Sequence, residues 1–425
     1  MRLAEVFTRI VGDDPPIGFK AFDGSRAGPQ TGAPILDVRD RTALNYLTSA
    51  RRFELGLARA YVTGALDVVG DLYSGLKSLW TLEYNMSKWE MLKIFNSLGG
   101  VRLLRRPALP QREAKLSGRK HSKKRDAEAI AHHYDVGNDF YELVLGDSMT
   151  YTCALYQETD TTLERAQFGK YDLVARKLGL QPGMRVLDIG CGWGGMVMHA
   201  ARHYGAKVIG VTLSKEQAEW GQKTIKSQGL GDKAEVRYMD YRDVDESEFD
   251  AISSIGLTEH VGTENLKEYF SSLYGRLRPG GRLLNHCITK PDGYGPAIMR
   301  GGFISRYVFP DGSLAGPGTL MSHMHDAGFE VRHTENLREH YALTLRDWVT
   351  NLERAWVKAV ELAGEETARA WRLYLVGSRL GFEHNGIQLH QILGVKLRDG
   401  ANADMPLRPQ WLYTSVTDRN GAGRR

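Results

Sequence analysis

A glycine-rich turn is the feature of this sequence best suited to chemistry. The segment VLDIGCGWGG at 186–195 places four glycines where an apolar strand passes into a helix. Glycine at such a junction lets the backbone approach a ligand in the crevice at the strand's carboxyl end. Ordering four glycines on folding costs backbone conformational entropy, and without a ligand no packing would compensate for that cost. We therefore predict a small-molecule site at this turn.

The strand expected after this turn argues against an ordinary dinucleotide site. Dinucleotide-binding folds usually close that strand with an acidic residue, which binds the ribose hydroxyls. Here the strand KVIGVTL ends in Thr212 and Leu213, without an acid. Ser214 follows, with Gln217 three residues later, and this spacing predicts a helix N-cap with a capping box.

The pattern Asp-x-Gly-x-Gly-x-Gly that starts at Asp188 resembles motif I of class I S-adenosylmethionine-dependent methyltransferases. Further segments narrow this resemblance to the cyclopropane-fatty-acyl-phospholipid synthases and the related mycolic acid methyltransferases. The similarity covers about residues 125–395, and LGLARAYVTG at 55–64 resembles the N-terminal domain of the longer bacterial synthases. The segments, in chain order, are HYDVGNDFY at 133–141, MTYTCA at 149–154, the glycine turn, TLSKEQ at 212–217, SIGLTEHVG at 254–262, and HCI at 286–288 with YVFP at 307–310.

The resemblance implies that S-adenosylmethionine is the cofactor and that its methionine moiety faces the glycine turn. Tyr151 and Thr152 would lie near the methionine carboxylate or the sulfonium, and Tyr241 and Arg242 near the adenine edge. Without the resemblance, Tyr241 and Arg242 are as well explained by a solvent-facing strand end. No metal site is expected. The implied cofactor-binding residues are Tyr151, Thr152, Asp188, Gly190, Gly192, Gly194, Thr212, Leu213, Gln217, Tyr241 and Arg242.

In that family the cofactor's methyl group moves to a cis double bond of an acyl chain that is esterified in phospholipid. A carbocation forms, and loss of a proton from the new methyl group closes a cyclopropane ring. An alkene is a poor nucleophile, so such a site must exclude water and hold the reactants close together. Aromatic faces stabilise a cation, and Tyr307, Phe309 and Tyr341 are the candidates.

The resemblance assigns the proton acceptor to a bound bicarbonate, held by Cys153, Glu259, His286, Ile288 and Tyr341. Main-chain N–H groups at Cys153 and Ile288 would donate to the anion. His286 and Tyr341 would donate or relay a proton, while Glu259 would orient the histidine and accept a proton. Taken singly, these residues also fit structural roles. His286 could be a structural histidine, Glu259 half of an ordinary strand-end pair, and Cys153 a small buried side chain that is not a nucleophile.

Three departures from the family pattern leave the product open. Leu257-Thr258 stands where many relatives have Met-Phe, Thr152 replaces a common serine, and Asp311-Gly312 follows Phe-Pro. The same carbocation gives a methylene- or methyl-branched chain when it loses a different proton. The sequence is also compatible with a soluble natural-product methyltransferase and with a non-catalytic lipid-binding relative. The basic linker and the extra N-terminal region favour lipid, and the intact bicarbonate-binding set favours an enzyme.

The elements that must position these residues alternate between strand and helix after about residue 165. This alternation predicts an α/β fold, in which a Rossmann-like methyltransferase domain has a parallel sheet with helices on both faces. The segment 126–144 predicts a helix, a turn and a second helix. The segment ENLKEYFSSLYGRLRPGG at 264–281 predicts a helix that stops at Pro-Gly-Gly.

The chain has 425 residues, so two domains are expected. The segments IGFKAFDG and APILDVRD predict strands, and residues 41–68 follow with helical spacing that Gly56 and Gly64 interrupt. We assign residues 1–100 to a small N-terminal α/β domain for lipid contact or dimerisation, 101–125 to a basic linker, and 126–425 to the methyltransferase domain. The family resemblance suggests a homodimer.

Charge and composition set limits on the partners. The net charge is only +5, and no aromatic platform or helix-turn-helix pattern indicates nucleic acid. The basic linker is either a solvated connector or a site for anionic lipid head groups, where each Lys or Arg contributes roughly 1 kcal/mol. The three cysteines lack metal-ligand spacing, and we find neither a secretory signal nor an apolar run of about 18 residues. We expect a cytoplasmic protein that acts on unsaturated phospholipid acyl chains at the inner face of the membrane.

Overall fold

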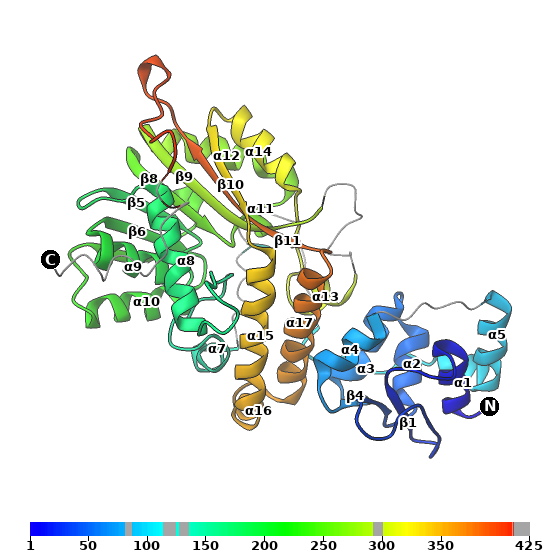
Figure 1. The fold of residues 1–425 in the computed structure, drawn as a ribbon. Helices are drawn as coiled ribbons and strands as arrows, with labels where there is room; N and C mark the ends of the chain where they lie inside the picture. The colour runs from blue at the N-terminus through cyan, green and yellow to red at the C-terminus, as the bar shows by residue number, and fades with distance from the viewer. Residues whose placement is uncertain (81–86, 114–124, 127–135, 292–300, 410, 412–425) are drawn as a thin grey trace. The chain divides into compact units, whose positions relative to one another are not determined.

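The computed structural model describes residues 1–80, 87–113, 125–126, 136–291, 301–409 and 411 (Figure 1). Its contacts divide the chain into two compact units. The first unit comprises Met1–Lys115, Met299–Pro310 and Leu352–Leu380, and the second comprises Leu116–Ile298, Asp311–Asn351 and Gly381–Arg425. Two segments that the sequence placed in the methyltransferase domain therefore group with the N-terminal residues. The lysines of the basic linker and most of the helix expected at its end lie outside the described residues.

The first unit contains a four-stranded sheet in the order β2-β1-β3-β4. The two strands expected from the sequence are present as β1 and β3, which pair in parallel. The long helical segment divides into two helices, and its end forms strand β4 because Gly64, with φ of 76°, reverses the chain after the second helix. The bounds are α1 Leu3–Val11, β1 Gly18–Ala21, β2 Arg26–Ala27, β3 Ile35–Val38, α2 Thr42–Ser49, α3 Phe53–Val62, β4 Leu66–Val69, α4 Leu72–Trp80, α5 Lys88–Ser97, η1 Gly100–Leu104 and α13 Phe303–Tyr307.

The second unit contains a seven-stranded sheet in the order β10-β11-β9-β8-β5-β6-β7. The strands from β9 to β7 in this order are parallel, as the strand-helix alternation predicts. The last two strands of the chain, β10 and β11, add an antiparallel edge, which the alternation did not indicate. The α/β Rossmann-like fold class is confirmed. The strands are β5 Arg185–Ile189, β6 Lys207–Thr212, β7 Ala234–Tyr238, β8 Phe249–Ile255, β9 Leu277–Thr289, β10 Glu330–Asn336 and β11 Gln388–Val395.

Helices cover both faces of this sheet (Figure 1). Successive residues of β5 point to opposite faces, so Val186 packs into one hydrophobic cluster and Leu187 into another. The first cluster includes side chains of α8, α9 and α10, and the second includes side chains of α12 and α14. The helices are α7 Asn138–Leu145, α8 Leu163–Leu178, α9 Gly195–Tyr204, α10 Lys215–Ser227, η2 Tyr241–Asp243, α11 Thr258–Val261, η3 Thr263–Asn265, α12 Leu266–Arg276 and α14 Pro317–Asp326.

Helices α15 Arg338–Arg354 and α17 Glu365–Glu383 each contribute residues to both units, and α16 Trp356–Ala363 belongs to the first. One expected helix end is wrong. Helix α12 stops at Arg276, and the Pro-Gly-Gly segment belongs to the start of the long strand β9. A strand accommodates these residues because Gly280 adopts a φ of 83° there. Within the described residues, no helix is both long and apolar enough to cross a membrane.

Candidate active site

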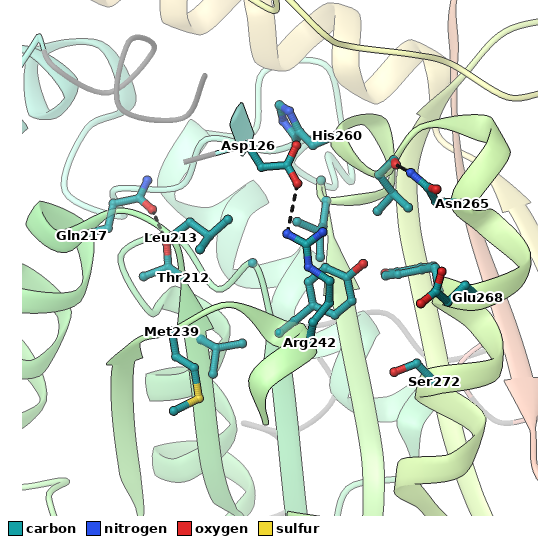
Figure 2. Close-up of a pocket in the computed structure, with 18 residues that line it drawn as sticks. Asp126, Thr212, Leu213, Gln217, Met239, Arg242, His260, Asn265, Glu268 and Ser272 are labelled. Atoms are coloured by element: carbon teal, nitrogen blue, oxygen red, sulfur yellow. Dashed lines mark hydrogen bonds and ion pairs between the residues drawn. The ribbon is translucent and has the colours of Figure 1, made fainter. Parts of the chain in front are cut away.

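A cavity of about 460 Å³ lies at the carboxyl ends of β5, β6 and β8, which is where a ligand binds in this type of sheet (Figure 2). The predicted cofactor residues at the ends of these strands line it together. It is lined by Asp126, Gly190, Gly192, Val211, Thr212, Leu213, Gln217, Met239, Tyr241, Arg242, Gly256, Leu257, His260, Val261, Asn265, Glu268, Tyr269 and Ser272.

The glycine turn has the backbone that its sequence predicts. Gly190, Gly192 and Gly194 have φ values of 69°, 56° and 84°, a backbone conformation that residues other than glycine rarely adopt. A Cβ atom at Gly190 would also lie 3.2 Å from the side chain of Leu257. Leu257 is one of the departures from the family pattern, and it therefore lies against the glycine turn in the cofactor cavity.

The cap that follows β6 differs in part from the expected capping box. Ser214 Oγ accepts a hydrogen bond from the Gln217 N–H at 3.3 Å, as expected. The Gln217 side chain does not turn back to the Ser214 N–H, which instead donates to Thr212 Oγ1. Thr212 Oγ1 donates to Gln217 Oε1 at 2.8 Å (Figure 2). Gln217 Nε2 is buried and has no hydrogen-bond partner among the described residues, so it is available to a ligand.

The predicted adenine end carries a charged network. Arg242 Nε donates to Asp240 Oδ1 at 2.8 Å, and Arg242 Nη2 lies 3.0 Å from Asp126 Oδ2 (Figure 2). The guanidinium is therefore neutralised by two carboxylates and lies along the wall of the cavity. Burial raises the pKa of Tyr241 to about 12, which keeps its hydroxyl protonated near neutral pH.

A smaller cavity of about 70 Å³ adjoins the first and shares Gly190, Gly192, Gln217 and Gly256 with it. Tyr151, Thr152 and Asp188, all predicted to bind the cofactor, line this second cavity. Sequence reasoning missed Lys170, which also lines it and is fully buried. On an amphipathic helix a lysine is ordinarily solvated, so the sequence gives no sign of its burial. The complete lining is Met149, Thr150, Tyr151, Thr152, Lys170, Tyr171, Asp188, Gly190, Cys191, Gly192, Trp193, Gly195, Met196, Gln217, Ile255 and Gly256.

Glu259 lies on the short helix α11, and not at a strand end. Its Oε1 accepts a hydrogen bond from the Ile288 N–H at 2.6 Å, and its Oε2 has no partner among the described residues. The Ile288 N–H therefore holds Glu259 in place, and is not free to donate to an anion as the sequence suggested. Burial raises the pKa of Glu259 to about 7, so this carboxyl group can hold a proton near neutral pH.

His286, on β9, is completely buried. Its Nδ1 lies 3.1 Å from Gln391 Nε2, and Gln391 Oε1 accepts a hydrogen bond from Lys177 Nζ at 2.6 Å. The Lys177 ammonium group can only donate, so the amide oxygen of Gln391 must point toward it. The amide N–H of Gln391 then points toward His286, and Nδ1 of the histidine must accept its hydrogen bond. His286 therefore carries its proton on Nε2, which has no partner among the described residues. The residue that orients the histidine is Gln391, and not Glu259 as expected.

Burial, with Lys170 and Lys177 nearby, holds the pKa of His286 well below its usual range, so the ring is neutral. The histidine is linked to the cofactor cavities through the backbone. The Gly256 N–H donates to the His286 carbonyl at 2.8 Å, and Gly256 lines both cavities. The backbone of His286 is thus tied to the cofactor site, and its side chain carries a neutral N–H donor.

Cys153 and Tyr341 complete the predicted set. Cys153 Sγ is buried 3.3 Å from the Ala154 carbonyl, and burial raises the pKa of the thiol, which leaves it an uncharged side chain. Tyr341 stacks on Phe382 with ring centroids 4.4 Å apart, and its edge meets Trp348. Trp348, which sequence reasoning missed, also packs against Tyr151 of the smaller cavity. The remaining aromatic candidates, Tyr307 and Phe309, belong to the first unit.

Residues 121–392 match the family described as mycolic acid cyclopropane synthetase. The chain belongs to this family. It is 48% identical to "Probable fatty acid methyltransferase Rv3720" of Mycobacterium tuberculosis, over 96% of this chain and 97% of the relative. It is 35% identical to the cyclopropane-fatty-acyl-phospholipid synthase of Escherichia coli strain K12, over 64% of this chain and 69% of that protein.

Among solved structures, it resembles the mycolic acid cyclopropane synthase CmaA1 complexed with SAH and CTAB. The TM-score is 0.60 and the identity 33%, over 64% of this chain and 98% of that chain. The protein is thus an S-adenosylmethionine-dependent methyltransferase of the cyclopropane synthase and fatty acid methyltransferase family.

Proposed function

We propose that the protein transfers a methylene unit from S-adenosylmethionine to the cis double bond of an unsaturated acyl chain in phospholipid, forming a cyclopropane ring. One observation carries this proposal. Glu259 Oε2 and His286 Nε2 are both buried without a partner among the described residues, and the main-chain carbonyl of His286 accepts a hydrogen bond from Gly256, which lines the cofactor cavity. Closing the ring requires removal of a proton from a methyl group, and a buried pair of polar atoms that no side chain binds can hold the acceptor of that proton.

The two unpartnered groups have the chemistry that binds bicarbonate. A protonated Glu259 and the Nε2–H of His286 are donors to an oxyanion, and their burial strengthens such hydrogen bonds. Glu259 and His286 would hold the anion, which would supply the proton acceptor for ring closure. The Ile288 N–H and Gln391 keep these two side chains in position. Tyr151 lines the smaller cavity and packs against Trp348, and such aromatic rings would stabilise a carbocation and exclude water.

A methylene- or methyl-branched acyl chain is the second candidate product. The relative with 48% identity is named a probable fatty acid methyltransferase, and not a cyclopropane synthase. Leu257 and Thr258, which depart from the usual family pattern, lie at the site. Leu257 contacts Gly190, and Thr258 Oγ1 donates to Asn285 Oδ1 at 2.7 Å. Both products require the same methyl transfer, and they differ in which proton leaves the carbocation.

A membrane surface is the partner we propose for the first unit. Exposed apolar side chains gather on α5 and η1, which contact each other. Trp89 is 75% exposed and Val101 is 79% exposed. The exposed cations Lys93, Arg102, Arg105 and Arg106 lie among them. Apolar and aromatic side chains mixed with cations are typical of a surface that enters an anionic lipid interface. The α5 surface consists of Trp89, Met91, Leu92, Val101 and Leu104.

One cation of the basic linker is not available to lipid. Arg125 Nε lies 2.6 Å from Asp311 Oδ2, and both side chains are largely buried. Asp311 is another departure from the family pattern, and here it binds Arg125. The proposed lipid contact therefore rests on the α5 surface.

Mass spectrometry of lipids from cells that express the protein tests the product. We expect a gain of about 14 mass units on an unsaturated acyl chain, with no double bond left to hydrogenate. The same gain with a reducible double bond identifies a methylene branch. No gain on lipid, from a protein that binds S-adenosylmethionine, would overturn the proposal.

Vesicle binding tests the partner. Trp89→Ala with Leu92→Ala should weaken binding to phosphatidylglycerol vesicles by about tenfold or more, because each side chain loses apolar burial. Val357→Ala is the matched control, since Val357 is 73% exposed on another helix of the same unit. Equal binding by the double variant and the control would remove the α5 surface from the proposal.

A further inference from the structure

Helix α8 carries two lysines that are both completely buried, Lys170 and Lys177. Lys177 Nζ forms an ion pair with Glu335 and donates to Gln391 Oε1 at 2.6 Å. Lys170 Nζ has a different environment. It donates to Thr152 Oγ1 at 3.1 Å and lies 3.6 Å from the ring centre of Tyr171. Within the described residues, no carboxylate lies within ion-pair distance of Lys170 Nζ.

A buried ammonium without a carboxylate needs another source of negative charge, because removing a charge from water is costly unless the charge is paired. The hydroxyl and the ring face around Lys170 supply only part of that compensation. Lys170 lines the smaller cavity with Gly190 and Gly192, so a ligand in this cavity can reach its Nζ. The environment of Lys170 therefore favours a ligand with an anionic group.

Asp188 lines the same cavity and is also buried. Its Oδ1 accepts a hydrogen bond from Ser253 Oγ at 2.6 Å, and it forms no ion pair with Lys170. The small cavity therefore presents a cation and a carboxylate at separate positions. An α-amino acid has the complementary arrangement, a carboxylate and an ammonium attached to the same carbon atom.

We propose that Lys170 binds the methionine carboxylate of S-adenosylmethionine, with the ammonium group of the same moiety facing Asp188. The carboxylate is the only anionic group of this cofactor, and its adenosyl part suits the larger cavity, which has room for it. Thr152 Oγ1 keeps the Lys170 side chain in the cavity while the cofactor is absent. The inference rests on the S-adenosylmethionine dependence of the family and is independent of the acceptor lipid.

Calorimetric titration with two donors tests this assignment. S-adenosylmethionine and decarboxylated S-adenosylmethionine differ only in the carboxylate, so the ratio of their dissociation constants measures its contribution. We expect the wild-type protein to bind the decarboxylated donor about 10- to 100-fold more weakly, as for loss of a hydrogen bond between charged groups. Lys170→Met, which has a similar length and no charge, should reduce this ratio to about one.

Lys177→Met is the matched control, because Lys177 is equally buried on the same helix and already has partners. It should keep the wild-type ratio. A wild-type ratio near one would overturn the proposal, and so would a Lys170→Met protein that discriminates as the wild type does.

A crystal structure of the wild-type protein with S-adenosylhomocysteine gives a second measurement that does not depend on the folding of a variant. A carboxylate oxygen within about 3.2 Å of Lys170 Nζ is the expected result. A carboxylate bound elsewhere, with Nζ still on Thr152 alone, would contradict the assignment.

Discussion

The two buried lysines of α8 lie seven residues apart, which is about two helical turns. Lys177 faces the antiparallel edge of the sheet, where β10 and β11 supply Glu335 and Gln391. Lys170 faces the glycine turn, where the chain supplies a hydroxyl and a ring. Two equally buried lysines can therefore have different roles. A buried charge whose ion-pair partner comes from the chain belongs to the scaffold, and a buried charge that forms no ion pair and lines a cavity belongs to a ligand site.

Other buried groups follow the same division. Gln217 Nε2, Glu259 Oε2 and His286 Nε2 each lack a partner among the described residues, although the other polar atom of each side chain is bonded. In each case the chain fixes one end of the side chain and leaves the other end for a ligand. Four predictions test this division between scaffold and site.

Glu259→Gln should have the largest effect, a fall in turnover of about 100- to 1000-fold, because the residue no longer exchanges a proton. The affinity for S-adenosylmethionine should not change. Product formation on lipid vesicles and calorimetry measure the two quantities separately. Glu246→Gln is the control, since Glu246 is bonded to Arg237 away from the site. Wild-type turnover in Glu259→Gln would refute the role of the unpartnered oxygen.

Lys177→Met should destabilise the protein, whereas Lys170→Met should not. Loss of Lys177 leaves the buried Gln391 Oε1 without a donor, which should lower the free energy of unfolding by about 1–3 kcal/mol. Loss of Lys170 removes a buried charge that forms no ion pair among the described residues, so stability should be unchanged or higher. Urea unfolding of both variants without cofactor measures the difference. Equal destabilisation by the two substitutions would contradict the assignment of Lys177 to the scaffold and of Lys170 to a ligand site.

Gln391→Glu should lower turnover about tenfold, since a carboxylate accepts a proton from Nδ1 and moves His286 to the other tautomer. Nitrogen NMR of the imidazole should show the change, and the pKa of His286 should rise toward its ordinary value. Gln388→Glu, an exchange near the start of the same strand, should change neither. An unaltered tautomer in Gln391→Glu would show that Gln391 does not orient the histidine.

The pH dependence of donor affinity should be the smallest effect. Burial raises the pKa of Asp188 to about 7 and lowers the pKa of Lys170 to about 7. As the pH rises from 5.5 to 7.5, roughly the range around those values, Asp188 gains charge and Lys170 loses it, so wild-type affinity should change little.

Each single variant should reveal one of these titrations. The affinity of Lys170→Met should rise with pH, because Asp188 is then the lining group of the small cavity that titrates in this range, and that of Asp188→Asn should fall. Tyr171 and Cys191 line the same cavity, and Cys153 and His286 are close enough to Lys170 to interact with it electrostatically. Burial raises the pKa of the two thiols and of the phenol and lowers that of the imidazole, so all four stay neutral. Glu259, whose pKa is about 7, lines neither cavity. Parallel slopes in the two variants would contradict these assignments.

Much of the fold and of the cofactor site was predictable from the sequence. The glycine turn, the absence of an acid after β6 and the strand-helix alternation are local patterns, and each reflects a backbone requirement at its own position. The roles of Ile288 and Gln391 were not predictable. The Ile288 N–H binds Glu259 across 29 residues, and Gln391 meets His286 across 105 residues. Contacts of that separation depend on strand order, and β11 joins the sheet antiparallel beside β9.

The sequence by itself determined the Rossmann-like sheet and its glycine turn, because turn geometry and helix periodicity depend on neighbouring residues. The resemblance to class I methyltransferases implied that S-adenosylmethionine is the ligand of this turn. Only the tertiary structure separated Lys170 from Lys177, since both occupy ordinary positions of an amphipathic helix. The partners of the two lysines come from residues 152, 335 and 391, and folding alone decides which of them reaches which ammonium group. The role of a buried lysine depends on the groups around its ammonium, and folding brings those groups together from distant parts of the chain.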